Sequence, residues 1–495
     1  MRKRLAITCT VIGLAFLIGT TVYRIGVSED SPYEQVRILV DILDQVMTNY
    51  VEEVDLKDLV YGAASGMLRT LDPFSQFLPP EALKEMKVET EGEFGGIGIR
   101  VGIGEDGWLT VVTPLPGTPA FQAGIYPRDR IIKIDGRTTD DITIEKAVQQ
   151  LRGKPGSKVV LTIERDEKMD AGEPRKEAKD FTLVREVIKI QTIYSRMVPD
   201  TKIGHIRITE FNARTPKDIH EIMTKYIKEE GMQALILDLR YNPGGLLPSA
   251  IETAKEFIGE NKMVVYTQGR RPESRVEYRA AQRAPYAELP LIVLVNEGSA
   301  SGSEILAGAL QDHKRAVLVG ARSFGKASVQ SVINLPDGSG LRLTTAYYYT
   351  PNGRLIHKKE FKRKKNQDNK DEEPPPASPE VELGQTSKAA VKSSKPEPKA
   401  AAKNKKEEEE IWGIDPDIHI AIDKETAAKV YQSYDLAYFP DKPSETKPVQ
   451  DIFKKKDKAS EKEAAEKKEE PVRDVMLDRA VELIKAREVL LQVPR

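Results

Sequence analysis

The sequence contains a single cysteine, Cys9, among its 495 residues. One thiol excludes both a disulfide framework and a metal site built from several thiolates within one chain. Positive charge is not in excess either, because 76 lysines and arginines are balanced by 77 acidic residues. This balance argues against nucleic acid as a partner, since nucleic-acid binding requires a basic surface. The length is sufficient for two or three domains with a large core.

Histidine is also scarce, with five in the chain, and this bears on a serine-rich turn in its second half. The turn, NEGSASGSE, runs from Asn296 to Glu304. It follows an apolar run typical of a buried strand, 291–295, and precedes a helical pattern, 305–310. Small residues let a serine hydroxyl stand clear of its neighbours, and a helix N-terminus offers free amides to an oxyanion. A flexible loop with a helix-capping serine is the alternative interpretation.

A nucleophilic serine requires a base. His313 stands at the end of the helix that follows the turn. The length of that helix places His313 about 15 Å from the serines of the turn, too far for proton transfer. Lys326 follows a second apolar run, 316–320, in the weakly charged context SFGKASVQ. A lysine acts as a base only when neutral, and burial in apolar surroundings favours the neutral form. We therefore expect a Ser-Lys pair rather than a Ser-His-Asp triad.

These residues resemble the carboxyl-terminal processing (tail-specific) peptidases, whose nucleophile is the second serine of an S-A-S-x-S-E run. The family's lysine lies 25 positions later in a G-K-x-x-x-Q element, and the matching positions here are Ser301, Lys326 and Gln330. The resemblance implies a serine endopeptidase that cleaves proteins near their C-terminus, with Ser301 as nucleophile, Lys326 as general base and Gln330 orienting the lysine amine. It implies no cofactor and no metal. Gly302 stands where the family usually has a small residue such as alanine.

A second turn, 238–245, has the sequence DLRYNPGG and ends in the pair Gly244 and Gly245. Adjacent glycines let backbone amides approach a reacting carbonyl closely. In the family this element forms one side of the oxyanion hole. The resemblance therefore implies Gly244 or Gly245 as one donor, with the Gly302 amide as the other. Taken alone, the glycine pair is as typical of a plain turn.

Residues 93–101, EFGGIGIRV, place glycines before alternating β-branched residues. Such a turn can aim backbone amides at a terminal carboxylate, and the strand edge can then accept an extended peptide. With the two segments 117–125 and 129–136, the succession resembles a PDZ domain over 91–185. The resemblance implies substrate binding by Gly96, Ile97, Gly98 and Ile99, with 144–151 as the groove helix and 159–165 as a closing strand. The implied partners are proteins or peptides with free, apolar C-termini.

Strand and helix patterns alternate in the segments 203–208, 216–228, 234–239, 249–257 and 263–266. This alternation predicts an α/β fold with a largely parallel sheet. The family resemblance sharpens this to a crotonase/Clp-protease-like core with an inserted PDZ domain and helical N- and C-terminal segments. The core is expected over 186–357 and 411–422, with a hairpin of strands 329–335 and 341–349 after Lys326.

The N-terminus begins with Arg2-Lys3-Arg4 and an uncharged stretch, Leu5 to Tyr23, close to the length that spans a bilayer. We expect an uncleaved membrane anchor within 1–27 and an extracytoplasmic, periplasmic enzyme, with a cleaved signal peptide as the alternative. Residues 28–90 are expected to be mainly helical, with an apolar face suited to core or dimer contacts. Phe74 stands where the family commonly has histidine.

Charged segments interrupt the second half of the chain. The tract 358–410 is rich in lysine, glutamate and proline and is expected to be a disordered insertion in the core. Residues 423–495 are expected to hold helices, including 475–491, around a second charged tract, 454–470. The helical ends could support a homo-oligomer. Two rival functions stay open, a catalytically silent PDZ scaffold and a Ser-His hydrolase of small esters.

Overall fold

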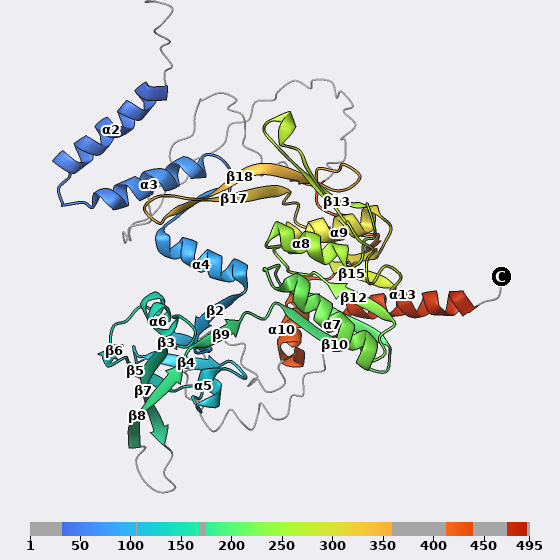
Figure 1. Ribbon diagram of the computed structural model, residues 1–495, viewed down its shortest axis with the longest axis horizontal. Coiled ribbons are helices and arrows are strands. Elements are labelled where there is room, and N and C mark those ends of the chain that lie inside the picture. Colours follow the sequence, from blue (N-terminus) through green and yellow to red (C-terminus); the bar gives the residue numbers. More distant parts are fainter. Residues whose placement is uncertain (1–31, 105, 168–174, 359–411, 439–472, 493–495) are drawn as a thin grey trace, which may run out of the picture.

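The computed structural model describes residues 32–104, 106–167, 175–358, 412–438 and 473–492 (Figure 1). The expected membrane anchor lies outside the described residues, as do both charged tracts apart from Lys358. Within the described ranges, no helix combines the length and the apolar character needed to cross a bilayer.

The centre of the molecule is a six-stranded sheet whose strand order is β10-β11-β12-β15-β16-β19. Its strands from β11 to β19 run parallel, and β10 is antiparallel at one edge. Every residue of β11, β12 and β15 is buried, as expected for parallel strands covered on both faces. The short edge strand β19 follows the first charged tract and returns the chain to the core. The bounds are β10 (Ile193–Met197), β11 (Ile203–Ile208), β12 (Ala234–Asp238), β15 (Leu291–Val295), β16 (Val317–Gly320) and β19 (Ile418–His419).

Helices cover both faces of this sheet. On one face, α7 (Thr215–Glu229), α8 (Leu247–Lys255) and α9 (Gly302–Asp312) enclose the larger apolar core. On the other face, α13 (Val475–Gln492) packs Met476, Leu477, Ala480 and Ile484 against strand residues. The parallel sheet and its helices confirm the predicted α/β arrangement.

One predicted strand belongs to a different sheet. Residues 263–266 were expected in the parallel sheet, but β13 (Met263–Gly269) pairs antiparallel with β14 and β18 in a second, five-stranded sheet. The prediction was wrong because a short apolar run indicates a strand without indicating its partner. This second sheet contains the predicted hairpin and runs above the helical layer in Figure 1. Its other strands are β1 (Gln76–Leu78), β14 (Val276–Arg279), β17 (Ser328–Asn334) and β18 (Gly340–Tyr349).

The segment expected to resemble a PDZ domain forms a separate six-stranded sheet with its own apolar core. The predicted groove helix is α6 (Ile144–Leu151), which lies beside the edge strand β3. A two-stranded ribbon, β2 (Glu93–Gly96) and β9 (Glu186–Lys189), joins this sheet to the rest of the chain. The remaining elements are β3 (Ile99–Ile103), β4 (Leu109–Pro114), α5 (Pro119–Gln122), β5 (Arg130–Ile134), β6 (Arg137–Thr138), β7 (Lys158–Glu167) and β8 (Arg175–Val184).

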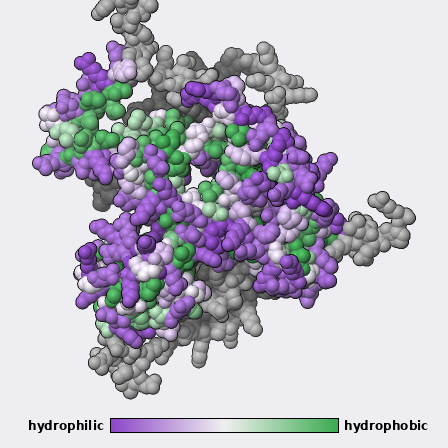
Figure 2. Space-filling model, viewed as in Figure 1, coloured by the Kyte–Doolittle hydropathy of each residue, from purple (hydrophilic) through white to green (hydrophobic). Residues whose placement is uncertain are grey.

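Three helices precede this domain, α2 (Pro32–Asn49), α3 (Leu56–Arg69) and α4 (Pro80–Glu91). The apolar face of α2 does not enter the core, because Val36, Leu39, Val40 and Met47 are all exposed. Figure 2 shows hydrophobic residues gathered over α2 and α3. At the other end of the chain, α10 (Lys424–Tyr438) lies against the central sheet close to α13.

Candidate active site

The candidate nucleophile Ser301 occupies the junction between β15 and α9. Its backbone has φ 52° and ψ −110°, a conformation that residues other than glycine rarely adopt. The turn is held in place by the 238–245 segment, since the Ala300 amide donates to Asn242 O (2.9 Å) and Ser299 Oγ donates to Leu239 O (2.8 Å). The surrounding contacts thus impose a strained backbone at the residue that the sequence singles out.

Glu304, one turn into α9, connects Ser301 to the loop of Lys326. The carboxylate accepts hydrogen bonds from the amides of Ser301 (2.8 Å), Gly325 (2.6 Å) and Lys326 (2.9 Å), and from Ser323 Oγ (2.5 Å). The side chain is fully buried. Burial raises the pKa of the Glu304 carboxyl, and the four hydrogen bonds oppose this shift. One acidic side chain thereby holds the two candidate catalytic residues side by side.

Tyr348 of β18 forms a second link between the same two segments. Its hydroxyl lies 3.1 Å from Ser301 O and 2.8 Å from Lys326 O, and the ring is almost completely buried. The structure therefore brings the backbones of Ser301 and Lys326 close together. Within the described residues, however, no hydrogen bond joins the Ser301 hydroxyl to the Lys326 amine. Such catalytic contacts are often long without substrate and shorten when it binds.

The Lys326 amine lies over an aromatic ring and close enough to three charged groups to be affected by them. Its Nζ is 4.6 Å from the centre of the Phe74 ring. Burial lowers the pKa of Lys326, and the positive charge of Arg342 lowers it further, while Glu304 and Asp72 oppose the shift. A lowered pKa increases the fraction of neutral lysine, which is the form that can accept a proton.

Gln330 lies on β17, next to a bulge in its pairing with β18. Its Nε2 donates to Ser328 Oγ (2.8 Å) and, at 3.4 Å, to Thr344 Oγ1. Among the described contacts none joins Gln330 to Lys326, so the structure does not pair these two side chains.

The glycine pair explains how the two turns approach each other. A Cβ on Gly244 would lie 2.7 Å from both Gly302 N and Ser301 Cβ, and one on Gly245 would lie 2.1 Å from Phe211 O. The Gly244 amide donates to Asn242 Oδ1 (2.8 Å), which engages it away from a substrate. Among the described residues, no acceptor meets the amides of Gly245 and Gly302. These two amides, rather than that of Gly244, are free to bind an oxyanion.

The loop of Ile97 and Gly98 is expected to bind a terminal carboxylate. Its carbonyl groups already accept backbone hydrogen bonds. Ile97 O accepts from the Ala120 amide (3.0 Å) and Gly98 O from the Leu115 amide (2.8 Å). The amides of Ile97 and Gly98 have no backbone acceptor in the described part of the chain. Gly96 and Ile99, which flank them, end β2 and begin β3. These two amides lie beside the edge strand β3, where the sequence predicts that a terminal carboxylate binds.

Of the five histidines, His357 lies beside the candidate site, with its ring centre 6.5 Å from that of Phe74. The contacts shown for them are His205 with Asp238, His220 with Glu256, His313 with Met263 O, His357 with the Ala327 amide and His419 with Asp415. None of these described contacts reaches Ser301, which leaves the Ser-His interpretation without support.

Sequence reasoning missed Glu304, Tyr348 and Phe74 as parts of the site. Glu304 had a usable signal, since a glutamate three residues after a helix-capping serine is the capping-box position. Tyr348 and Phe74 had none, because each reaches the site from a distant segment. Within the described residues no cluster of acidic residues, histidines and cysteine could hold a metal ion.

Profiles of three protein families match parts of the chain. The profile of Peptidase family S41 matches residues 202–364, a PDZ domain profile matches 110–165, and that of the Activating protease CtpB N-terminal domain matches 24–82. The chain is 41% identical over 333 residues to the carboxy-terminal-processing protease of Bartonella bacilliformis, which covers 66% of this chain and 74% of that protein. It is 34% identical over 358 residues to the carboxy-terminal processing protease CtpA of Bacillus subtilis. That match covers 72% of this chain and 73% of the relative.

Among solved structures, a photosystem II D1 C-terminal processing protease matches with a TM-score of 0.37 and 29% identity, over 66% of this chain and 84% of that one. The family assignment rests on the sequence relatives, each of which is matched over most of its length. The chain belongs to the carboxy-terminal processing proteases of peptidase family S41 and contains a PDZ domain.

Proposed function

We propose that the protein is a serine endopeptidase in which Ser301 and Lys326 form the catalytic dyad. The observation that carries the proposal is that Glu304 and Tyr348 each contact the backbone of both residues. A nucleophile beside a partly buried lysine with a lowered pKa meets the requirement for activating a hydroxyl without histidine. The proposed core is crotonase/Clp-protease-like, with an anchor in 1–27 placing the enzyme on the extracytoplasmic face of the membrane.

In the proposed mechanism, neutral Lys326 takes the proton from Ser301 Oγ as this oxygen attacks the scissile carbonyl. The amides of Gly245 and Gly302 stabilise the resulting oxyanion. The protonated amine of Lys326 then gives its proton to the leaving amine, and the acyl group stays on Ser301. A water molecule, deprotonated by Lys326, hydrolyses this ester and regenerates the enzyme. Gln330 is proposed to orient the lysine amine through Oε1, since its Nε2 already donates to Ser328 and Thr344.

The proposed substrates are proteins whose free C-terminus is captured by the PDZ domain. We expect that amidating the C-terminus of a peptide with an apolar last residue reduces its cleavage severalfold. The reason is that hydrogen bonds from the amides of Ile97 and Gly98 to a charged carboxylate are roughly twice as strong as those to a neutral group. The measurement is kcat/KM for the acid and amide forms of one peptide.

The control for this experiment is a variant without the PDZ domain. Gly96 and Glu186 are cross-strand partners, so a short glycine linker can replace residues 97–185 and leave the β2–β9 ribbon in place. This variant should cleave the acid and amide forms at similar rates. Equal cleavage of the two forms by the intact enzyme would contradict tail recognition and leave the catalytic dyad unaffected.

A further inference from the structure

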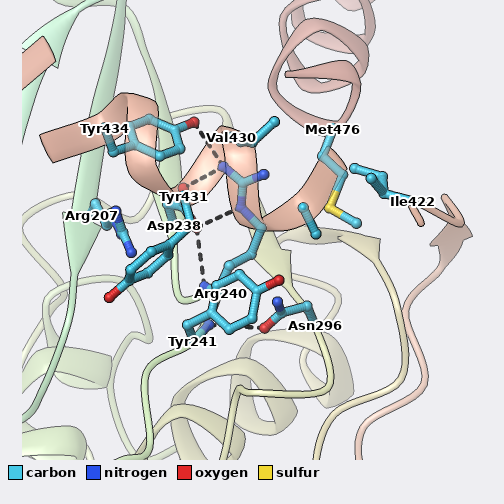
Figure 3. A pocket seen from close by; sticks show the side chains of 11 residues that line it. Arg207, Asp238, Arg240, Tyr241, Asn296, Ile422, Val430, Tyr431, Tyr434 and Met476 are labelled. Atoms are coloured by element: carbon cyan, nitrogen blue, oxygen red, sulfur yellow. Dashed lines mark hydrogen bonds and ion pairs between the residues drawn. The ribbon is translucent and has the colours of Figure 1, made fainter. Parts of the chain in front are cut away.

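The C-terminal helices contact the segment that carries Gly245, and one of these contacts is made by a buried side chain, that of Arg240. Arg240 follows β12 and is 6% exposed. Figure 3 shows its guanidinium between Asp238, from the same segment, and Tyr434 of α10. Asp474, directly before α13, reaches the same group. Tyr434 and Asp474, which follow Arg240 by about two hundred positions or more, thus contact it near the start of the 238–245 segment.

The contacts of Arg240 are many and charged. Its guanidinium donates two hydrogen bonds to Asp238 (2.9 and 2.7 Å) and two to Asp474 (2.9 and 2.8 Å), and a further one to the Tyr434 hydroxyl (2.8 Å). Paired hydrogen bonds between arginine and carboxylate fix orientation as well as distance. The helix α13 already packs apolar residues against the sheet, and Val430 of α10 is buried, so this network adds a defined geometry to apolar packing.

A second contact reaches the next residue. The Tyr431 ring of α10 meets the ring of Tyr241 edge to face, with centroids 5.1 Å apart. Tyr241 has φ 57°, a conformation that neighbouring contacts must stabilise. Its amide donates to Asn296 Oδ1 (2.8 Å), and Asn296 begins the turn of Ser301. The guanidinium of Arg207 lies over both Tyr431 (4.6 Å) and Tyr434 (5.1 Å), which fixes α10 at this place.

Hydrogen bonds of Asn242, the residue after Tyr241, connect this segment to the neighbourhood of the oxyanion donors Gly245 and Gly302. Asn242 Oδ1 holds the Gly244 amide, and Asn242 O accepts from the Ala300 amide (2.9 Å) and from Ser303 Oγ (3.0 Å). A displacement of Arg240 and Tyr241 would therefore move the loop of Gly245 relative to the turn of Ser301. Misplacement by about 1 Å can cost about a hundredfold in rate.

We propose that α10 and α13 position the 238–245 segment, which carries the oxyanion donor Gly245. In this proposal Asp474 and Tyr434 act through Arg240 as positioning residues. The inference rests on the proposed function of Gly245 and Gly302 as oxyanion donors. It assigns the C-terminal segment a part in catalysis although neither Asp474 nor Tyr434 contacts Ser301 or Lys326 among the described interactions.

The test uses two variants that keep the local structure. Asp474 also caps α13, because Oδ1 accepts from the Leu477 amide (3.1 Å). Asp474→Ser retains a good N-cap and removes the carboxylate from Arg240. Tyr434→Phe retains the ring over which Arg207 lies and removes only the hydroxyl. As a control, Arg479→Ala changes an exposed residue of α13 that pairs with Glu482.

We expect kcat to fall about tenfold or more in Asp474→Ser and severalfold in Tyr434→Phe, with KM unchanged in both, because an oxyanion donor acts in the transition state. Binding of a peptide aldehyde, whose adduct with a serine hydroxyl mimics the tetrahedral intermediate, should weaken by the same factor as kcat. The double variant should lose less than the product of the single losses, since both residues act through Arg240. The Arg479→Ala enzyme should match the wild type.

Thermal unfolding of each variant establishes whether it is folded at the assay temperature. If Asp474→Ser is unfolded there, the kinetics of Tyr434→Phe test the proposal. A folded variant with wild-type kcat and aldehyde affinity would overturn the proposal, as would a rise in KM without a fall in kcat. These results would leave the dyad intact as long as the wild type cleaves peptide. A wild type without peptidase activity would instead contradict the proposed function itself.

Discussion

Replacing Lys326 by arginine is expected to reduce kcat/KM at least tenfold, a loss of at least about 1.4 kcal/mol in transition-state stabilisation. Arginine keeps the positive charge but does not deprotonate at any working pH, so it cannot take the proton from Ser301. In the wild type, kcat/KM should rise with pH, because the neutral fraction of Lys326 increases as the pH passes its pKa. Burial lowers that pKa, which moves the rise toward neutral pH.

The measurement is kcat/KM for one peptide across the alkaline range. Lys217→Arg serves as the matched control, since Lys217 is an exposed residue of α7 that pairs with Glu221. Retention of more than about a tenth of wild-type activity by Lys326→Arg would show that this lysine is not the base.

The second large effect is expected from Glu304→Gln, which changes one buried oxygen to an NH₂ group. The four donors that now meet the carboxylate include the amides of both Ser301 and Lys326. A glutamine nitrogen would oppose two of these donors, and each buried donor left without an acceptor costs about 1–3 kcal/mol. We expect the free energy of unfolding to fall by about 3 kcal/mol and kcat/KM to fall about a hundredfold.

Denaturant unfolding and peptide kinetics measure the two effects separately. Glu297→Gln makes the same chemical change at an exposed position of the same turn and should alter neither quantity. Wild-type activity in Glu304→Gln would contradict the conclusion that this carboxylate holds the two catalytic segments in register.

The elements around Ser301 could be predicted because each has a local signature. A buried run of leucine, isoleucine and valine marks β15, and small residues followed by a helical pattern mark the turn and α9. The same holds for the strands and helices on either side of the glycine pair. Local patterns did not mark every strand that pairs with the next one along the chain, because β10 and β14 were not predicted.

Contacts between distant segments could not be predicted. The apolar run of β13 indicates a strand, but its partner β18 lies some eighty residues further along the chain. Tyr348 and Phe74 reach Lys326 from β18 and from the segment before β1, and neither position carries a pattern that indicates this contact. The engagement of the Gly244 amide by Asn242 also depends on side-chain geometry, which composition and spacing do not determine.

The most direct test of the central claim compares the wild type with Ser301→Ala on an unstructured protein substrate, with the products identified by mass spectrometry. If Ser301 is the nucleophile, the wild type should release fragments cut near the C-terminus, and the variant should release none over the same period while unfolding at the wild-type temperature. Cleavage by folded Ser301→Ala at the same sites and at a rate near that of the wild type would contradict the account.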